Sequence, residues 1–275
     1  MRVELLHRIS SQGSGRSNDD AAGHAVGADW VDFWIVDGAT SVSDVQYVPG
    51  PDSDPQWYAN FLCERFSSLA VAKLPLPEIL ARSIADARSS YETIVGRLSA
   101  VPVFAWPLAA ASYVRVSRAN DHFAVESCHL GDCSVFIRSE EHEALALWDP
   151  GCPEPPLTAP AAFAEQTNRL RQRRLEQHST PMSGIAGFDP SAAKFATSAS
   201  ARIAGSFDIV LATDGLARLY KEYALITRSA FVDGATRPPG TDSLITALRE
   251  AEQRGVGAAF YKGRDDATLL AARVS

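Results

Sequence analysis

Residues 30 to 38 are Trp-Val-Asp-Phe-Trp-Ile-Val-Asp-Gly, an aromatic and β-branched run that ends in an Asp-Gly turn. This composition favours a strand that is buried on at least one face. Asp37 is therefore predicted at the carboxyl end of the strand, where the glycine lets the backbone turn sharply. A single Asp-Gly pair is weak evidence of a site, because the pair is common in ordinary turns.

Three further acidic turns flank predicted strands, and together with Asp37-Gly38 they carry the functional argument. They are Asn18-Asp19-Asp20-Ala21, Thr213-Asp214-Gly215-Leu216 and Arg264-Asp265-Asp266-Ala267-Thr268. Carboxylates gathered from distant parts of one chain repel one another and are costly to bury, unless cations lie between them. Because carboxylates are hard oxygen ligands, these turns predict a site for Mg²⁺ or Mn²⁺.

Length and charge limit the classes of protein to consider. The 275 residues, 46% hydrophobic and 21% charged, predict one elaborated domain over residues 1–275. A net charge of -7 argues against bulk attraction to nucleic acid or to an anionic membrane. No stretch reaches the roughly 18 apolar residues of a membrane span, and no signal peptide is evident, so we expect a cytoplasmic protein. The cysteines are predicted to be reduced thiols: Cys63, Cys128, Cys133 and Cys152.

The remaining sequence alternates groups of helices with groups of strands. Helices are predicted at 54–71 with Asp54 as the cap, at 77–98, through 169–174, and from 241 or 242 to 254. Strands are predicted at 110–116, 123–130 and 133–138, as an antiparallel meander, and at 194–203, 207–212 and 267–274. Residues 149–160 are proline-rich and predict an irregular connection. Without regular βαβ alternation, this order favours an α+β layered fold over a doubly wound parallel sheet.

The order of these motifs resembles that of the metal-dependent type 2C protein serine/threonine phosphatases, in the form of a divergent bacterial-type member. The motifs that carry the resemblance are Asn18-Asp19-Asp20-Ala21, Asp37-Gly38, Gly131-Asp132-Cys133-Ser134, Thr213-Asp214-Gly215 and Asp265-Asp266-Ala267-Thr268. They span nearly the whole chain. Each is unspecific alone, but five in the family's order make a strong joint signal.

The resemblance implies two antiparallel β-sheets packed as a sandwich, with helices on both outer faces, and two Mn²⁺ or Mg²⁺ ions at one end. Carried over by position, the implied metal ligands are Asp37 as the bridge, Gly38 through its carbonyl, Asp19 at one ion, and Asp214 and Asp265 at the other.

The resemblance also implies an activity and two catalytic residues. Asp20 would bind a metal-coordinated water, and Arg16 would bind the substrate phosphate, which a guanidinium fits well. The implied reaction is hydrolysis of phosphoserine or phosphothreonine in a protein by a water that bridges two divalent ions. The partner is then a phosphorylated protein, with neither nucleic acid nor membrane, while the oligomeric state stays open.

Three departures from the family pattern keep alternatives open. Asp19 stands where the family has a glutamate, Asp266 replaces its asparagine, and Ala39 stands where animal members have a histidine. Asp19 and the missing histidine motivate a second hypothesis, a catalytically weak phosphoprotein-binding regulator with the same fold. A third is a small-molecule phosphomonoesterase. A haloacid-dehalogenase phosphatase is disfavoured, because Val36-Asp37-Gly38 lacks the Asp-x-Asp-Gly-Thr pattern of that family's nucleophile.

Overall fold

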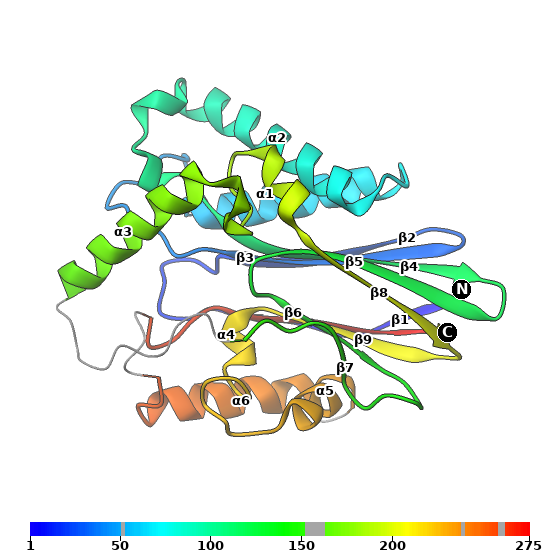
Figure 1. Ribbon diagram of the computed structural model, residues 1–275. Helices are drawn as coiled ribbons and strands as arrows, with labels where there is room; N and C mark the ends of the chain where they lie inside the picture. The colour runs from blue at the N-terminus through cyan, green and yellow to red at the C-terminus, as the bar shows by residue number, and fades with distance from the viewer. Residues whose placement is uncertain (51–52, 152–162, 238–239, 258–261) are drawn as a thin grey trace.

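Two antiparallel sheets pack face to face in the computed structural model, which describes residues 1–50, 53–151, 163–237, 240–257 and 262–275. Within these residues, ten strands form two five-stranded sheets. Helices α1 and α2 cover the outer face of one sheet, and α5 and α6 cover the outer face of the other (Figure 1). The predicted α+β sandwich with helices on both outer faces is therefore confirmed.

The first sheet has the order β1-β10-β9-β6-β7 and the second has the order β2-β3-β4-β5-β8. The strands of the first are β1 (Val3–Ser11), β10 (Ala267–Val274), β9 (Phe207–Ala212), β6 (Ser134–Arg138) and β7 (Leu145–Trp148). Those of the second are β2 (Asp20–Val26), β3 (Trp30–Gly38), β4 (Ala109–Ala119), β5 (His122–Leu130) and β8 (Thr197–Ala204). All strand pairs in both sheets are antiparallel.

The α-helices are α1 (Asp54–Ala70), α2 (Leu76–Val95), α3 (Phe163–Ser179), α4 (Asp214–Ala217), α5 (Arg228–Thr236) and α6 (Gly240–Gln253). Short 3-10 helices cover Leu98–Ala100, Val103–Ala105, Pro181–Ser183 and Pro190–Phe195. None of the helices in the described part of the chain combines the length and apolar character that crossing a membrane requires.

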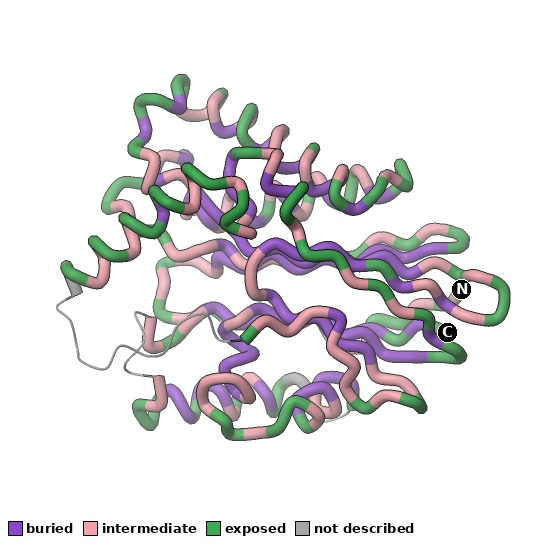
Figure 2. The backbone as a smooth tube through the Cα atoms, viewed as in Figure 1, coloured by how far each residue is buried: buried purple, intermediate pink, exposed green. Residues whose placement is uncertain are grey.

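Strand β3 is buried on both faces, because it lies between the other sheet and helix α1. Phe33 and Ile35 pack between the two sheets with Val135 and Ile209, and all four side chains are fully buried. Alternate residues such as Trp34 belong to the cluster beneath α1 and α2. Figure 2 shows the resulting buried layers through the middle of the molecule. The strand pleat therefore anchors Asp37-Gly38 at the end of a rigid element.

A charged pair fixes the register of β3 against β4. Asp32 lies opposite Arg115, whose Nε and Nη2 donate to the two carboxylate oxygens at 2.8 and 2.6 Å. The Tyr113 hydroxyl also donates to Asp32, which is fully buried. A bidentate pair of this kind is directional, so it favours one register over its neighbours.

Several element predictions are wrong in ways that the structure explains. Residues 133–138 do not continue a meander: β6 pairs with β7 and β9, because the chain crosses to the other sheet at Gly131-Asp132. Ser53, and not Asp54, caps α1 by accepting from the Gln56 amide. The Asp54 carboxylate instead accepts from the amides of Tyr47 and Val48.

Other differences concern where elements begin and which elements the sequence analysis missed. Lys194 lies in a 3-10 helix, so the strand predicted at 194–203 begins at Thr197 as β8. Strands β2 and β7 and helix α5 were not predicted. Most of the predicted irregular connection, with Cys152, lies outside the described residues. The other three cysteines, Cys63, Cys128 and Cys133, are free thiols, as predicted.

Candidate metal centre

The acidic turns meet at one end of the sandwich because of the antiparallel pairing. Asp20 at the start of β2 lies directly opposite Asp37 near the end of β3. In the other sheet, Ala212 at the end of β9 pairs with Leu269 near the start of β10, which brings Asp214 close to Asp265. In Figure 1 these strand ends lie at the end of the sandwich opposite the two chain termini.

Two of the turn glycines are required by close backbone contacts. A Cβ at Gly38 would lie 2.5 Å from the Asp19 carbonyl oxygen, and the Gly38 amide donates to that oxygen at 3.0 Å. A Cβ at Gly215 would lie 1.9 Å from the Asp266 carbonyl oxygen. Any side chain at either position would push apart the segments that carry the carboxylates.

Hydrogen bonds between the two sheets hold these turns together. The Asp266 carboxylate accepts from the backbone amides of Gly13 at 2.7 Å and Asp19 at 2.9 Å. The Thr213 hydroxyl donates to Asp20 Oδ2 at 2.9 Å and accepts from the Thr268 amide at 2.9 Å. Asp266, which directly precedes β10, therefore joins β10 to the segment before β2.

Four carboxylates lie close enough to perturb one another. Burial, and then the charges of Asp214, Asp20 and Asp132, raise the pKa of Asp37 well above its ordinary value. Burial and the charge of Asp214 raise the pKa of Asp132 to about 7. Burial also raises the pKa of Asp214 and, well above its ordinary value, that of Asp20. Such shifts arise where like charges share a desolvated site without a neutralising ion.

One of these carboxylates has an oxygen without a partner. Asp20 is only 9% exposed, and among the described residues its Oδ1 has no hydrogen-bond donor. An unpaired buried carboxylate oxygen is costly, and a cation would remove that cost. With Asp37, Asp132 and Asp214 near it, the set offers only hard oxygen ligands, the kind that Mg²⁺ and Mn²⁺ prefer.

The other carboxylates are paired with cationic side chains. Lys262 Nζ lies 3.3 Å from Asp265 Oδ1 and 3.9 Å from both Asp19 Oδ2 and Asp266 Oδ2. Arg218 Nη2 donates to Asp265 Oδ2 at 2.7 Å. Burial alone would lower the pKa of Lys262, but the nearby carboxylates outweigh it and hold that pKa above its ordinary value. Cations therefore form ion pairs with Asp19, Asp265 and Asp266, whereas Arg218 and Lys221 act on Asp214 through longer-range charge.

The predicted site residues thus fall into three groups. Asp20, Asp37 and Asp214 gather with Gly38 and have no ion pair among the residues that the structure describes, whereas Asp19 and Asp265 form ion pairs with Lys262 and Arg218. Arg16 is exposed, and no ion pair of its guanidinium is found within the described part of the chain. Across the same residues, no three Asp, Glu, His or Cys side chains stand in an arrangement ready to hold a metal ion. Their roles as ligands remain predictions.

Helix α3 brings further positive charge to the same end. Arg174 Nη2 donates to the Thr40 carbonyl at 3.0 Å, just beyond Asp37-Gly38. Burial and the charge of Arg173 lower the pKa of Arg174 to about 10. The charges of Lys221 and Arg173 partly offset the rise in the pKa of Asp132. Cations that reach the rim of a carboxylate cluster are suited to binding an anionic ligand.

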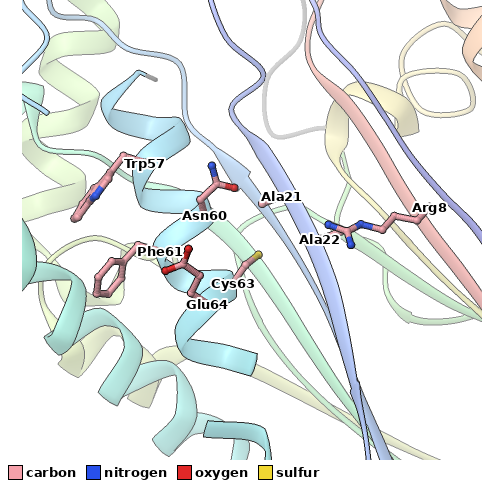
Figure 3. A pocket seen from close by; sticks show the side chains of 8 residues that line it. All are labelled: Arg8, Ala21, Ala22, Trp57, Asn60, Phe61, Cys63 and Glu64. Atoms are coloured by element: carbon pink, nitrogen blue, oxygen red, sulfur yellow. The ribbon is translucent and has the colours of Figure 1, made fainter. Parts of the chain in front are cut away.

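A separate open groove of about 350 Å³ lies beside helix α1. It is lined by Arg8, Ala21, Ala22, Trp57, Asn60, Phe61, Cys63 and Glu64 (Figure 3). None of the clustered aspartates lines this groove. Burial raises the pKa of the Cys63 thiol to about 12, so this cysteine is not activated as a nucleophile.

Sequence reasoning missed three residues of the cluster as site residues. Asp132 stands in a motif that the resemblance already quoted, so motif order could have identified it. Lys262 and Arg218 had no such signal. Their contacts with Asp265 depend on how the segment before β10 folds against α4.

Solved structures share this fold at low sequence identity. No known protein family and no curated protein matches the sequence. The catalytic domain of the serine/threonine protein phosphatase PstP in complex with two manganese ions is 12% identical, with a TM-score of 0.54 over 100% of both chains. RsbX in complex with magnesium is 10% identical, with a TM-score of 0.54 over 100% of both chains. The serine/threonine phosphatase Stp1 from Staphylococcus aureus is 12% identical, with a TM-score of 0.53 over 100% of this chain and 96% of that one. The chain therefore has the fold of the type 2C serine/threonine phosphatases.

Proposed function

We propose that this protein hydrolyses phosphoserine and phosphothreonine phosphomonoesters in proteins and depends on Mn²⁺ or Mg²⁺. The observation that carries the proposal is the gathering of Asp20, Asp37, Asp132 and Asp214 in one desolvated cluster. It lies at the end of a sandwich that solved metal-containing structures share. A divalent ion bound there would lower the pKa of a water and polarise the phosphoryl oxygens.

The chain's own residues supply placement and charge. Asp37 and Asp214, from the ends of β3 and β9, would be the principal ligands, and Gly38 would add its carbonyl. Asp20 would hold a coordinated water through Oδ1, while Thr213 fixes Oδ2. Ligands at the ends of rigid strands keep their geometry, which favours in-line attack on phosphorus.

The substrate phosphate needs positive charge at the rim of the site. Arg16 is the residue that the sequence predicts, and its exposure leaves it accessible to a phosphoprotein. Arg173 on the exposed side of α3 also acts on Asp132 and adds positive charge there, whereas the Lys221 side chain is mostly buried and its ammonium is paired with Asp149 at 3.1 Å. Since Ala39 follows Asp37-Gly38, the leaving group would take its proton from water, not from a histidine.

Hydrolysis of a phosphothreonine peptide with and without Mn²⁺ tests the proposal. Asp37→Asn and Asp214→Asn each remove a ligand charge, so we expect kcat/KM to fall by at least about 100-fold. Asp121→Asn is the matched control, because Asp121 is exposed in the turn between β4 and β5, away from the cluster, and should keep full activity. Equal activity of all three variants, or turnover that survives EDTA, would refute the proposal.

The substrate class is tested with the same proteins. We expect phosphopeptides to be turned over with higher kcat/KM than sugar or nucleotide phosphates, because Arg16 is exposed and can bind a phosphate that a protein segment carries. The opposite ranking would favour a small-molecule phosphomonoesterase acting at the same cluster.

A specific observation favours a second candidate function, a phosphoprotein-binding regulator with weak catalysis. Lys262 and Arg218 already neutralise Asp19 and Asp265, two of the predicted metal ligands. A site with too few free ligands would bind metal weakly and retain phosphoprotein binding. Phosphopeptide binding without any metal-dependent turnover would establish this alternative, and turnover abolished by Asp37→Asn would exclude it.

A further inference from the structure

Lys262 occupies the middle of the Asp19, Asp265 and Asp266 carboxylates, and so contacts one predicted ligand of each of the two metal ions, Asp19 and Asp265. Its Nζ is within 4 Å of an oxygen of each of the three, and its side chain is only 11% exposed. A lysine ammonium is a compact point charge that can approach three carboxylates at once. It therefore provides there the positive charge that a divalent ion would otherwise provide.

The lysine is held in place by its surroundings. Arg218 Nη1 donates to the Lys262 carbonyl at 3.1 Å, while Nη2 donates to Asp265. Arg249 donates to the Asp265 carbonyl at 2.9 Å and to the Ser11 carbonyl at 2.8 Å, which ties this segment to β1. Because the backbone carbonyls of Lys262 and Asp265 are both held by hydrogen bonds, the ammonium is restricted to this position.

The carboxylates around the lysine are also satisfied. Asp265 Oδ1 accepts from the Asp266 amide at 3.1 Å, and Asp19 Oδ1 accepts from the hydroxyls of Ser17 and Ser53. The contrast with Asp20 is clear, since Asp20 Oδ1 is buried and has no partner among the described residues. An added cation would therefore be most stabilising beside Asp20, Asp37 and Asp214.

We infer that Lys262 is a tethered cation that takes the place of one of the two divalent ions, so that this chain binds a single tight ion beside Asp37 and Asp214. The inference rests on the proposed function for the identity of the ion. A divalent ion that uses either Asp19 or Asp265 would have to displace the ammonium from that carboxylate, and the ligands that remain, Asp37 and Asp214, are enough for one ion. Lys262 affects metal binding through its charge and takes no direct part in the reaction.

Counting bound Mn²⁺ on the full chain tests the inference. Free Mn²⁺ is measured by electron paramagnetic resonance during a titration, and the same titration is followed by calorimetry. We expect one tight ion in the unchanged protein and in Lys262→Arg, which keeps the positive charge. Lys262→Met keeps most of the stem and loses the charge, so it should gain a second ion, bound at least about tenfold more tightly than in the unchanged protein. Lys194→Met, at an exposed lysine, should change nothing.

A second variant makes the test independent of how well Lys262→Met folds. If Asp265 is occupied by Lys262 and Arg218, Asp265→Asn should keep the single tight ion, whereas Asp37→Asn should lose it. Two tight ions in the unchanged protein, loss of the tight ion in Asp265→Asn, or no Mn²⁺ binding at all would overturn the inference. Failure of the phosphatase proposal would appear differently, as normal ion counts without phosphopeptide turnover.

Discussion

Asp132 shows at the level of a single residue what the acidic cluster costs the metal-free protein. Its pKa is about 7 in the folded chain against an ordinary value of 3.8, because burial and Asp214 oppose its charge. A raised carboxyl pKa gives stability that is complete below about pH 4 and is lost as the pH rises to about 7. Above that pH the folded state carries the full repulsion of the cluster.

Asp132→Asn should remove this pH dependence. In EDTA, we expect the variant to exceed the unchanged protein in stability by as much as about 4 kcal/mol at pH 8 and by much less at pH 5. Urea unfolding at the two pH values measures the difference. The buried His129 and His178, which titrate in the opposite sense, are present in both proteins and cancel. If the two proteins differed equally in unfolding free energy at both pH values, the pKa of Asp132 would not be raised in the folded state.

At the scale of elements, the Asp32–Arg115 pair joins β3 to β4 and so supports the strand that carries Asp37. Arg115→Met leaves a fully buried carboxylate, and within the described ranges of the chain the Tyr113 hydroxyl is then its one remaining side-chain partner. We expect a loss of about 3 to 5 kcal/mol, since breaking a buried pair strands one charge. Denaturant unfolding measures this loss. The double variant Asp32→Asn with Arg115→Met should recover part of it, and failure to recover would mean that the arginine stem, not the charge, matters.

Gly131 is the element-scale feature that sends the chain from one sheet to the other. It has φ +87°, and a Cβ there would lie 2.4 Å from the Ala110 Cβ. Gly131→Ala should therefore cost about 2 to 4 kcal/mol, from backbone strain plus overpacking. Gly205→Ala is the control, because Gly205 has φ +67° and open space around it. This variant should lose about 1 kcal/mol of unfolding free energy, from backbone strain alone. Similar losses in the two variants, measured by urea unfolding, would contradict this account.

The limits of sequence reasoning follow from the range of each interaction. The buried strand at Trp30–Val36 and the helix from Asp54 follow local patterns, and both were predicted close to their true positions. Strand β6 was assigned to the wrong sheet, because the turn at Gly131-Asp132 looks like a hairpin turn until Ala110 is known to pack against it. Lys262 shows the same limit at the site, since its contacts with Asp19 join residues far apart in the chain.

For the molecule as a whole, the candidate centre is also the place where the two sheets are joined. Asp266 reaches from β10 to the amides of Gly13 and Asp19, and Thr213 reaches from the end of β9 to Asp20. An ion held by Asp37 from one sheet and Asp214 from the other would add a third link of this kind. Metal binding should therefore be coupled to the stability of the entire sandwich.

This coupling predicts a rise in melting temperature with Mn²⁺. At a free concentration about 100 times the Kd, binding to the folded state alone contributes about 2.7 kcal/mol. For a chain of this size, that corresponds to a shift of roughly 5 to 10 °C. Asp37→Asn should lose most of the shift, while Asp121→Asn should keep it, as followed by circular dichroism with and without EDTA. An equal shift in both variants would place the bound ion away from Asp37, and the two sheets would then be joined by Asp266 and Thr213 without help from a metal.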